Sequence, residues 1–479
     1  MKLGIDLGTT TTTICRVGAS ALTPLGPYPS LAAFSNEKWL YGNYAAEAAE
    51  DAGRDLWLLS NIKLSMTHGD VRIAGRALDP INVLGEYLKA VFKEAGIGTV
   101  DKAVLGIPVR FSRGQRQALV RAAKRAGAGE VRLVYEPTAA LVGALEGHKL
   151  QGGDHVLVID WGGGTLDIAL IAYEGRAFRE VMISGDINIL GGAKIDHRLA
   201  NILLAADPVL AAEVAGVPSG ESKFLMQVER GKLQIVESLE IDPWHIEPPW
   251  LKHGAVLKPE LVTQVLEEFG KQAAERLLQL LSQSGVALSA VSHVLFAGGV
   301  SQSQVVREQI RKVLPQYCAE LESGTNPQLL TALGCARLSK EGFRLLTAAD
   351  VVFRESDGQL CTLLAGGREI EPDAYRTADL AVTGVTDQLA RIELGVRPVS
   401  ASSNGPAKGD GRFQRIGEIA VPTGADPGHP LTLAPADLVR MYVGLTSEMC
   451  LHAYAVSARA EKPAEDWFTD VPLAVHLGS

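Results

Sequence analysis

The chain has 479 residues, of which 47% are hydrophobic and 21% are charged, and its formal net charge is −9. This composition is typical of a folded globular protein, and the length predicts about three folding units. An acidic chain of this kind has no general electrostatic attraction for nucleic acid or for an anionic membrane, so neither is expected as a partner.

Strands and helices alternate in the first two thirds of the chain. Apolar runs predict strands over residues 2–7, 13–18, 102–108 and 131–136. Apolar residues that recur every three or four positions predict helices over residues 79–96, 113–127 and 137–147. A later strand at residues 293–299 is expected between helices at 259–282 and 302–314. Such alternation indicates an α/β fold.

The opening strand–turn–strand pattern recurs in the middle of the chain. Residues 5–8 (IDLG) and 159–162 (IDWG) each end an apolar strand and precede glycine or threonine residues and a second apolar strand. The recurrence predicts two related halves that begin with the same β-hairpin, although a match this short is equally compatible with chance.

The pattern changes beyond residue 345. Helical periodicity fades, and short alternating runs are separated by clusters of Gly, Pro, Asn, Asp and Ser, such as SASSNGPAKGDG at residues 400–411. Alternation with a period of two, bounded by turn residues, predicts an all-β domain. The boundary is expected near residues 345–353.

Three glycine-rich turns each follow a predicted strand, at residues 6–12, 160–165 and 296–303. Glycine lets the backbone turn tightly and bring successive N–H groups close to an anion. A carboxylate at the end of the strand, Asp6 or Asp160, could hold Mg²⁺ through water. Two such loops could grip a triphosphate from both sides. The alternative is that each is only a tight turn between strands.

Several segments resemble a known family. Residues 4–13 (GIDLGTTTTT) and 156–170 (VLVIDWGGGTLDIAL) are similar to the two phosphate motifs of the actin-like ATPase superfamily. Residues 106–127 and 135–145 (YEPTAALVGAL) resemble segments of the seventy-kilodalton heat shock protein (Hsp70-like) chaperone family. Further matching segments follow in the family's order, at residues 29–49, 61–66, 189–201, 227–233 and 293–314.

The resemblance, which extends over residues 1–342, implies a fold and a domain order. A two-lobed, actin-like (ribonuclease-H-like) α/β ATPase domain is expected over residues 1–344, with lobes at 1–152 and 153–344. A linker at 345–354 and a small all-β sandwich domain of the substrate-binding type at 355–479 would follow. The helical lid of typical members is not expected.

The resemblance also implies a site for ATP or ADP with Mg²⁺. Residues expected to take part in catalysis are Lys63, Glu136, Asp160 and Thr165. Residues expected to hold Mg²⁺ through water are Asp6 and Asp160. Residues expected to contact the nucleotide are Gly8, Thr9, Thr10, Gly162, Gly163, Gly164, Gly191, Gly192, Glu229, Lys232, Gly298 and Gly299. Residues expected to couple the domains are Pro108, Arg116 and Arg132.

Without the resemblance, several of these residues have ordinary structural interpretations. Lys63 could be a solvated surface lysine, and Glu136 a carboxylate favoured near a helix N-terminus. The resemblance implies instead that Lys63 neutralises charge at the γ-phosphate and that Glu136 lies near the attacking water. It also implies that Pro108 and Arg116 relay changes between domains and that Arg132 contacts a J-domain partner.

The sequence departs from the family at the adenine end of the site. Leu233 and Gln302 stand where the family has two arginines that sandwich the purine ring, and residues 326–329 are Asn-Pro-Gln-Leu in place of Asn-Pro-Asp-Glu. Each lost cation–π contact costs about 0.5–2 kcal/mol. Nucleotide binding is therefore expected to be retained but weak, with the base preference left open.

The implied function is that of an ATP-dependent chaperone, in which a weak ATPase controls the binding of unfolded peptide or a dedicated client protein. A J-domain co-chaperone and a nucleotide exchange factor would be further partners. One alternative is a nucleotide-sensing scaffold with little or no hydrolysis. The other is a small-molecule kinase of the same superfamily, which the YEPTAAL segment and the β-rich C-terminal part disfavour. Five widely spaced cysteines and an N-terminus without an apolar leader favour the cytoplasm.

Overall fold

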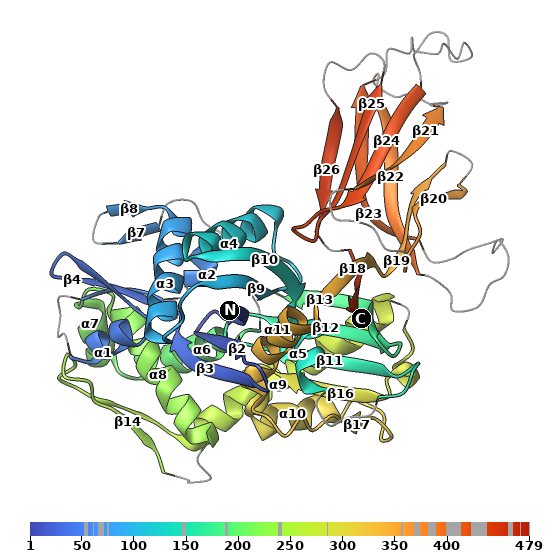
Figure 1. Ribbon diagram of the computed structural model, residues 1–479. Coiled ribbons are helices and arrows are strands. Elements are labelled where there is room, and N and C mark those ends of the chain that lie inside the picture. The colour runs from blue at the N-terminus through green and yellow to red at the C-terminus, as the bar shows by residue number, and fades with distance from the viewer. Residues whose placement is uncertain are drawn as a thin grey trace. The chain divides into compact units, whose positions relative to one another are not determined.

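The computed structural model describes residues 1–51, 56–60, 62–65, 71–73, 76–145, 150–186, 190–237, 242–284, 286–355, 358–367, 374–381, 389–398, 413–422, 438–457, 463–469 and 471–478. The chain divides into two compact units (Figure 1). The first contains Met1–Ile171 and Ser184–Gly342, and the second contains Ala172–Ile183 and Phe343–Ser479. In the described part of the chain, no helix is long and apolar enough to cross a lipid bilayer.

A five-stranded mixed sheet opens the first unit. In spatial order its strands are β10 (Ala128–Tyr135), β9 (Val100–Ile107), β1 (Lys2–Leu7), β2 (Thr11–Val17) and β3 (Leu22–Pro29). β1, β9 and β10 are parallel, whereas β2 is antiparallel to both of its neighbours. The helices of this part are α3 (Pro80–Glu94), α4 (Arg113–Arg125) and α5 (Glu136–Ala144). The predicted alternation of strands and helices is confirmed.

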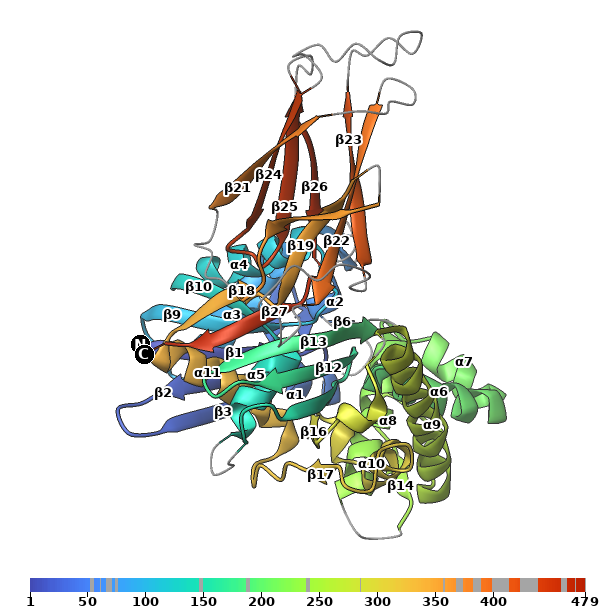
Figure 2. The ribbon, with the colours of Figure 1, turned by 90° about the vertical axis from the view of Figure 1, so that its right-hand side faces the viewer.

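A second mixed sheet repeats this arrangement (Figure 2). In spatial order its strands are β17 (Ala319–Glu320), β16 (His293–Ala297), β11 (His155–Trp161), β12 (Leu166–Tyr173), β13 (Ala177–Asp186), β27 (Leu473–Leu477) and β18 (Phe343–Thr347). β11, β16 and β17 are parallel, as β1, β9 and β10 are. Five strands thus share one order in both sheets, which is the arrangement expected if the repeated IDxG pattern marks two related halves.

Helices and small strands complete the first unit. The helices that follow the second hairpin are α6 (Gly192–Ala206), α7 (Pro208–Ala215), α8 (Gly220–Glu237), α9 (Pro259–Ser284), α10 (Gln304–Arg311) and α11 (Leu330–Glu341). The smaller elements are β4 (Ala32–Ser35), β5 (Lys38–Tyr41), α1 (Asn43–Asp51), β6 (Trp57–Leu59), α2 (Ile62–Ser65), β7 (Val71–Ile73), β8 (Arg76–Leu78), β14 (Trp244–Ile246) and β15 (Ala255–Leu257).

Helices α5 and α11 cross with their backbones in contact. A side-chain carbon at Gly334 of α11 would lie 1.7 Å from the Ala139 carbonyl oxygen of α5. In the reverse direction, a side-chain carbon at Gly143 would lie 2.1 Å from the Leu330 carbonyl oxygen. Only glycine permits this approach. The contact fixes α5, whose first residue is Glu136, against the core of the unit.

The second unit contains two four-stranded antiparallel sheets. The strands of one are β20 (Leu360–Leu364), β19 (Ala349–Arg354), β22 (Leu389–Pro398) and β23 (Gln414–Pro422). The strands of the other are β21 (Tyr375–Ala381), β24 (Leu438–Leu445), β25 (Leu451–Ser457) and β26 (Ala464–Phe468). One apolar cluster includes Val351 and Leu394 from the first sheet and Met441 and Leu451 from the second. As the alternating runs predict, every regular element described from residue 343 onward is a strand.

The segments that lead into and out of these two sheets pair with each other. β18 and β27 form an antiparallel ladder, and the other edge of β27 pairs with β13. The Leu473 N–H also donates to the buried carboxylate of Glu180 over 2.8 Å. Residues 345–354, expected to be a linker, therefore belong to β18 and β19, and residues 473–477 lie outside the two four-stranded sheets. Alternation could not predict this, because the strand partners of β27 are far away in the sequence.

Replacing Gly334 by Ala should lower the free energy of unfolding by about 1–3 kcal/mol or more, because the new methyl group would overlap the Ala139 carbonyl oxygen. Chemical denaturation of the full chain measures the change. The matched control is Gly98→Ala, since a side-chain carbon at Gly98 would meet no atom within 4 Å. The control should change the free energy of unfolding by less than about 0.5 kcal/mol. Equal stability of the two variants would contradict the packing argument.

Candidate functional site

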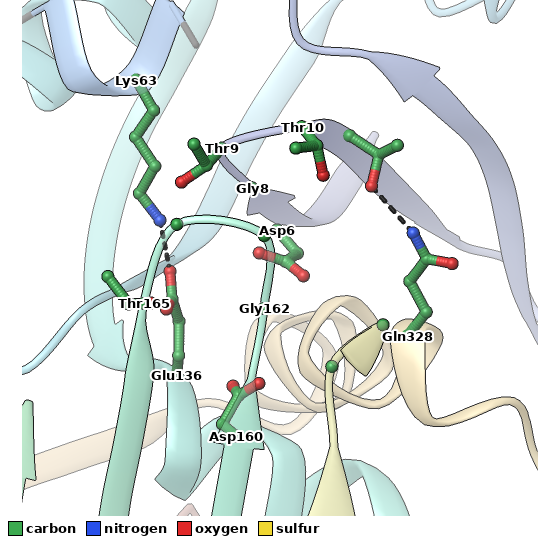
Figure 3. A pocket seen from close by; sticks show the side chains of 15 residues that line it. Asp6, Gly8, Thr9, Thr10, Lys63, Glu136, Asp160, Gly162, Thr165 and Gln328 are labelled. Carbon is green, nitrogen blue, oxygen red and sulfur yellow. Dashed lines mark hydrogen bonds and ion pairs between the residues drawn. The ribbon is translucent and has the colours of Figure 1, made fainter. Parts of the chain in front are cut away.

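A cleft in the first unit gathers most of the residues expected at the nucleotide site (Figure 3). Its lining consists of Asp6, Gly8, Thr9, Thr10, Thr11, Lys63, Glu136, Asp160, Gly162, Gly163, Gly164, Thr165, Gly298, Gly299 and Gln328. These residues come from the β1–β2 turn, the β11–β12 turn, the turn after β16, helices α2 and α5, and the short helix η3 (Pro327–Leu329). The tertiary structure therefore assembles the cleft from six separate segments.

The first and second glycine loops touch each other in the cleft. A side-chain carbon at Gly164 would lie 1.9 Å from the Thr9 hydroxyl oxygen. A side-chain carbon at Gly163 would lie 2.6 Å from the Thr10 hydroxyl oxygen. Glycine is required for this close approach. The two loops bring backbone N–H groups and threonine hydroxyls close together. Both kinds of group can donate hydrogen bonds to phosphate oxygens.

The third glycine loop lies beside the Asp160 carboxylate. Gly298 has a φ of +80°, and a side-chain carbon there would lie 2.8 Å from Asp160 Oδ1. The Gly298 N–H donates to the Pro327 carbonyl oxygen over 3.1 Å. The next residue, Gln328, donates from Nε2 to Thr11 Oγ1 over 2.8 Å. Helix η3 thus connects the third loop with the first.

A buried ion pair joins α2 to α5 inside the cleft (Figure 3). Lys63 Nζ lies 2.7 Å from Glu136 Oε1, and only 4% and 8% of the two side chains are exposed. Lys63 Nζ also lies 5.3 Å from the centroid of the Phe111 ring. Lys63 is therefore not a solvated surface lysine. Its ammonium group is fixed among the residues that line the cleft.

Three further carboxylates, those of Asp6, Asp160 and Asp167, interact electrostatically with this pair. Burial, and then the charge of Glu136, raise the pKa of Asp6 and the pKa of Asp167 to about 7. The same causes raise the pKa of Asp160 well above its usual range. Burial opposes the charged form of Lys63, but Glu136 and Asp6 hold the pKa of Lys63 above its ordinary value. One ammonium group faces four carboxylates, so the cleft is short of positive charge.

Asp167 is the site residue that sequence reasoning missed. Its side chain is fully buried in β12, and its Oδ1 accepts the Val109 N–H over 3.3 Å. Among the described residues, its Oδ2 has no hydrogen-bond partner. The available signal was its position, two residues after Thr165 in the GGGTLD segment. A charged residue within an otherwise apolar strand indicates a buried functional carboxylate, because burying an unpaired charge is costly.

This set of oxygen donors fits Mg²⁺. The ion prefers carboxylate oxygens and keeps several of its own waters. Asp6 and Asp160 could hold it through water, and the unpaired Asp167 Oδ2 offers a further acceptor. In the part of the chain that the structure describes, no group of three or more His, Cys, Asp or Glu residues could hold a metal ion directly.

Four residues expected to contact the nucleotide are not in the described lining of the cleft: Gly191, Gly192, Glu229 and Lys232. The Gly192 N–H donates to the Gly162 carbonyl oxygen over 3.0 Å, so the start of α6 braces the second loop. On α8, Lys232 Nζ forms a buried ion pair with Asp196 Oδ1 over 2.7 Å. Burial, and then the charge of Asp196, raise the pKa of Glu229 to about 7.

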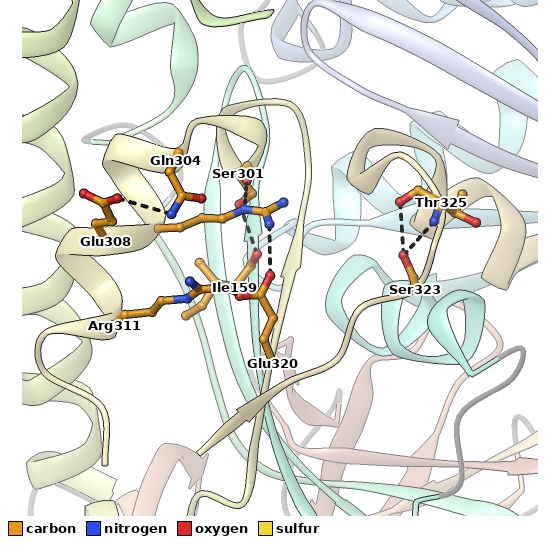
Figure 4. Close-up of polar contacts among 9 residues, drawn as sticks. Ile159, Ser301, Gln304, Glu308, Arg311, Glu320, Ser323 and Thr325 are labelled. Atoms are coloured by element: carbon orange, nitrogen blue, oxygen red, sulfur yellow. Dashed lines mark hydrogen bonds and ion pairs between the residues drawn. The ribbon is translucent and has the colours of Figure 1, made fainter. Parts of the chain in front are cut away.

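The two positions that depart from the family present no cation. Leu233 follows Lys232 on α8 and is 38% exposed. Gln302 ends the short helix η2 (Val300–Gln302). Arg307 of α10 is close in sequence but is directed elsewhere: it donates to the Ser301 carbonyl oxygen over 2.5 Å and to Glu320 Oε1 over 2.9 Å. Figure 4 shows Ser301 and Glu320 with their dashed contacts. Arg307 anchors η2 and does not replace the arginine that is missing at position 302.

The residues expected to couple the domains lie outside the described lining of the cleft. Arg116 is fully buried, and its guanidinium donates to the Val109 carbonyl oxygen over 3.2 Å. This bond holds the turn that begins at the buried Pro108. Because the Val109 N–H donates to Asp167, the turn is also connected to the carboxylate cluster. Arg132 is half-buried in β10, where burial lowers its pKa.

Comparison with known proteins places the sequence near one family. Residues 36–340 match a protein-family model described as Hsp70 protein. Over 377 residues, the chain is 26% identical to the chaperone protein DnaK of Thermus thermophilus, with 74% of this chain and 59% of that protein covered. Over 357 residues, it is 26% identical to the chaperone protein DnaK of Nitrosopumilus maritimus, with 70% and 55% covered. The chain thus spans a little more than half the length of these relatives.

The carboxylate cluster predicts a pH-dependent stability in the absence of a cation. The pKa of Asp167 is raised from its ordinary value of 3.8 to about 7 in the folded chain, so ionisation destabilises the fold. The folded chain keeps the Asp167 proton that the unfolded chain loses between about pH 4 and about pH 7, so the melting temperature in EDTA should fall over this range and level off above it. Asp167→Asn should reduce this fall, and saturating Mg²⁺ should counteract it.

Thermal unfolding monitored by circular dichroism measures this effect. Glu267→Gln on α9 is the control, because the Glu267 side chain is 46% exposed and lies outside the described lining of the cleft. It should retain the pH dependence of the wild-type chain. If the melting temperature falls equally with pH in the Asp167→Asn and wild-type proteins, Asp167 does not cause the pH dependence.

Proposed function

The chain belongs to the Hsp70 protein family, and we propose that it binds ATP or ADP with Mg²⁺ in the cleft of Figure 3 and hydrolyses ATP there. The observation that carries the proposal is the buried Lys63–Glu136 pair, with its 2.7 Å separation, beside two touching glycine loops. On this proposal, residues 1–344 are the actin-like ATPase domain. Residues 1–152 and 153–344 are its two lobes.

Each part of the cleft then has a role in phosphoryl transfer, which depends mainly on positioning and on charge neutralisation. The glycine loops and the threonine hydroxyls of the first loop cradle phosphate oxygens. Asp6 and Asp160 would hold Mg²⁺ through water, and the ion would supply the positive charge that the cleft lacks. Lys63 stabilises charge that develops at the γ-phosphate, Glu136 orients the attacking water, and Thr165 donates its hydroxyl to the γ-phosphate.

The second unit is the proposed partner-binding part. Its two antiparallel sheets and common apolar cluster support a β-sandwich of the substrate-binding type over most of residues 355–479. We assign to it the binding of unfolded peptide or of a dedicated client protein. A J-domain co-chaperone acting near Arg132, a nucleotide exchange factor and a cytoplasmic location complete the proposal. Pro108 and Arg116 would relay the nucleotide state, through the turn that Asp167 contacts.

A nucleotide-sensing scaffold with little hydrolysis is the second candidate. It is favoured by one observation, the exposed Leu233 and the neutral Gln302 at the positions of the purine-binding arginines. The loss of two cation–π contacts weakens adenine binding without changing the phosphate end of the cleft. Turnover, rather than binding, therefore distinguishes the two candidates.

Lys63→Ala and Asp160→Ala should each abolish ATP hydrolysis, because one removes the only lysine in the described lining of the cleft and the other a carboxylate that would hold Mg²⁺. Phosphate release measures hydrolysis, and calorimetric titration with Mg-ATP and Mg-ADP measures binding. Lys89→Ala is the matched control, because the Lys89 side chain is 65% exposed on α3. Hydrolysis that persists in both cleft variants would refute the site, whereas wild-type binding without hydrolysis would favour the scaffold.

Leu233→Arg combined with Gln302→Arg should tighten binding of adenine nucleotides about tenfold or more, because each guanidinium restores a cation–π contact with the purine ring. Titration with Mg-ADP and with a Mg-pyrimidine diphosphate separates base recognition from phosphate recognition. Only the purine affinity should rise. An equal gain for both nucleotides would show that the added charge acts on the phosphates instead.

A further inference from the structure

Aromatic side chains cover the outer face of one sheet in the second unit. Side chains alternate between the two faces of a strand, and Met441, Val443 and Ala453 point into the apolar cluster. The alternate positions of β21, β24, β25 and β26 therefore point outward. The outward residues that form this aromatic face are Tyr375, Tyr442, His452, Tyr454 and Trp467.

The five rings form one continuous surface. Tyr442 and Tyr454 are directly opposite each other on β24 and β25, and their rings stack with centroids 4.5 Å apart. His452 and Trp467 are opposite on β25 and β26 and stack at 3.7 Å. The Tyr375 ring meets both groups edge-on, at 5.6 Å from His452 and 5.4 Å from Tyr454. Contacts between rings therefore extend across all four strands of the sheet.

The surface is held in place by hydrogen bonds at its centre. The Tyr375 hydroxyl lies 2.8 Å from His452 Nδ1, and His452 Nε2 lies 3.0 Å from Glu465 Oε2. Tyr442, Tyr454 and Trp467 remain half-buried. Such a surface loses little conformational entropy when a partner binds, because its rings are already ordered.

The outer face of the other four-stranded sheet is different. It carries ion pairs between neighbouring strands, namely Arg391–Glu418 at 2.7 Å, Arg397–Asp350 at 2.7 Å and Arg415–Glu393 at 3.1 Å. Charged pairs of this kind suit a face in contact with water. On the aromatic face one such pair, Arg440–Asp379 at 2.7 Å, lies beside the rings, and two exposed apolar side chains, Leu438 and Val456, lie on the face as well. A contiguous apolar patch on one face only is typical of an interaction surface.

The charges beside the rings favour a basic partner. Arg440 is fully engaged with Asp379 by two hydrogen bonds of 2.7 and 3.0 Å, so these two charges neutralise each other. Glu465, whose side chain is 54% exposed, adds a carboxylate beside the rings, and one of its oxygens lies 3.0 Å from His452 Nε2. Such a face repels the phosphates of nucleic acid. It attracts a guanidinium group, which can stack on Tyr or Trp and pair with a carboxylate.

The main-chain pairing within the sheet also limits which peptides can bind this face. At the centre of the sheet the main-chain N–H and C=O groups are paired in ladders between strands. A peptide on this face therefore gains few main-chain hydrogen bonds. A proline-rich segment gives up the fewest main-chain hydrogen bonds when it binds such a face. Proline has no N–H, and the extended helix that it forms has no internal hydrogen bonds to break. Aromatic surfaces bind such segments through their rings.

We propose that the aromatic face binds an extended polypeptide segment that carries proline and arginine residues. Proline rings pack on Tyr442, Tyr454 and Trp467, and an arginine pairs with Glu465. This binding site differs from strand addition, which uses main-chain hydrogen bonds at a sheet edge. It does not depend on the nucleotide cleft, so a chain without ATPase activity would retain it.

Calorimetric titration of the full chain with a synthetic peptide of Pro-Pro-Arg repeats tests the proposal. Saturable binding is expected, and it should be weakened about tenfold by Tyr442→Thr, which removes a central ring. Tyr442→Phe keeps the ring and should bind nearly as well as the wild-type chain. Arg391→Thr, on the outer face of the other sheet, should leave the affinity unchanged. Melting temperatures of all variants identify any loss of folding.

A second peptide and two other ligands separate the alternatives. A Gly-Ser-Arg repeat has the same charge but no proline ring, and it should bind at least about tenfold more weakly if the aromatic face selects proline. Equal affinity for both peptides, or binding that Tyr442→Thr leaves intact in a folded protein, would overturn the proposal. So would the absence of peptide binding together with binding of an oligosaccharide or a single-stranded oligonucleotide.

Discussion

The first unit depends on one buried ammonium group that interacts with four carboxylates. Lys63 and Glu136 form the ion pair, and Asp6, Asp160 and Asp167 add negative charge that no other lysine or arginine in the described lining of the cleft balances. Burial makes this excess costly, and it raises the pKa of Asp6 and of Asp167 to about 7. On the proposed function, Mg²⁺ in the cleft would offset this cost, and the stability of this unit would then depend on the bound ion.

The packing of the backbone places these charges. Helices α5 and α11 cross at Gly143 and Gly334, where a side chain would collide with the opposite backbone. This contact fixes Glu136 at the start of α5, while Gly163 and Gly164 let the second loop reach the threonines of the first. The two sheets share one strand order, so each half contributes one hairpin and one carboxylate, Asp6 or Asp160, to the same cleft.

The two four-stranded sheets of the second unit have chemically different outer faces. Inward side chains of both sheets form one apolar cluster, whereas one outer face carries ion pairs and the other carries stacked aromatic rings. Strand alternation produces both outcomes, since outward positions are free to vary once the core is filled. In the same unit, β18 and β27 pair with each other, so the segments before and after the two sheets meet in one ladder.

The sequence by itself determined the α/β character of the first part, the strands beyond residue 345 and the glycine loops, because periodicity and turn chemistry act over a few neighbouring residues. It also indicated Lys63 and Glu136, through a resemblance to a family, and the structure brings them within 2.7 Å. Only the tertiary structure decided that Asp167 joins the carboxylate cluster, that Lys232 pairs with Asp196 and that β27 enters the sheet of β13. These features depend on contacts between residues distant in sequence, and local patterns carry no information about which distant segments will meet.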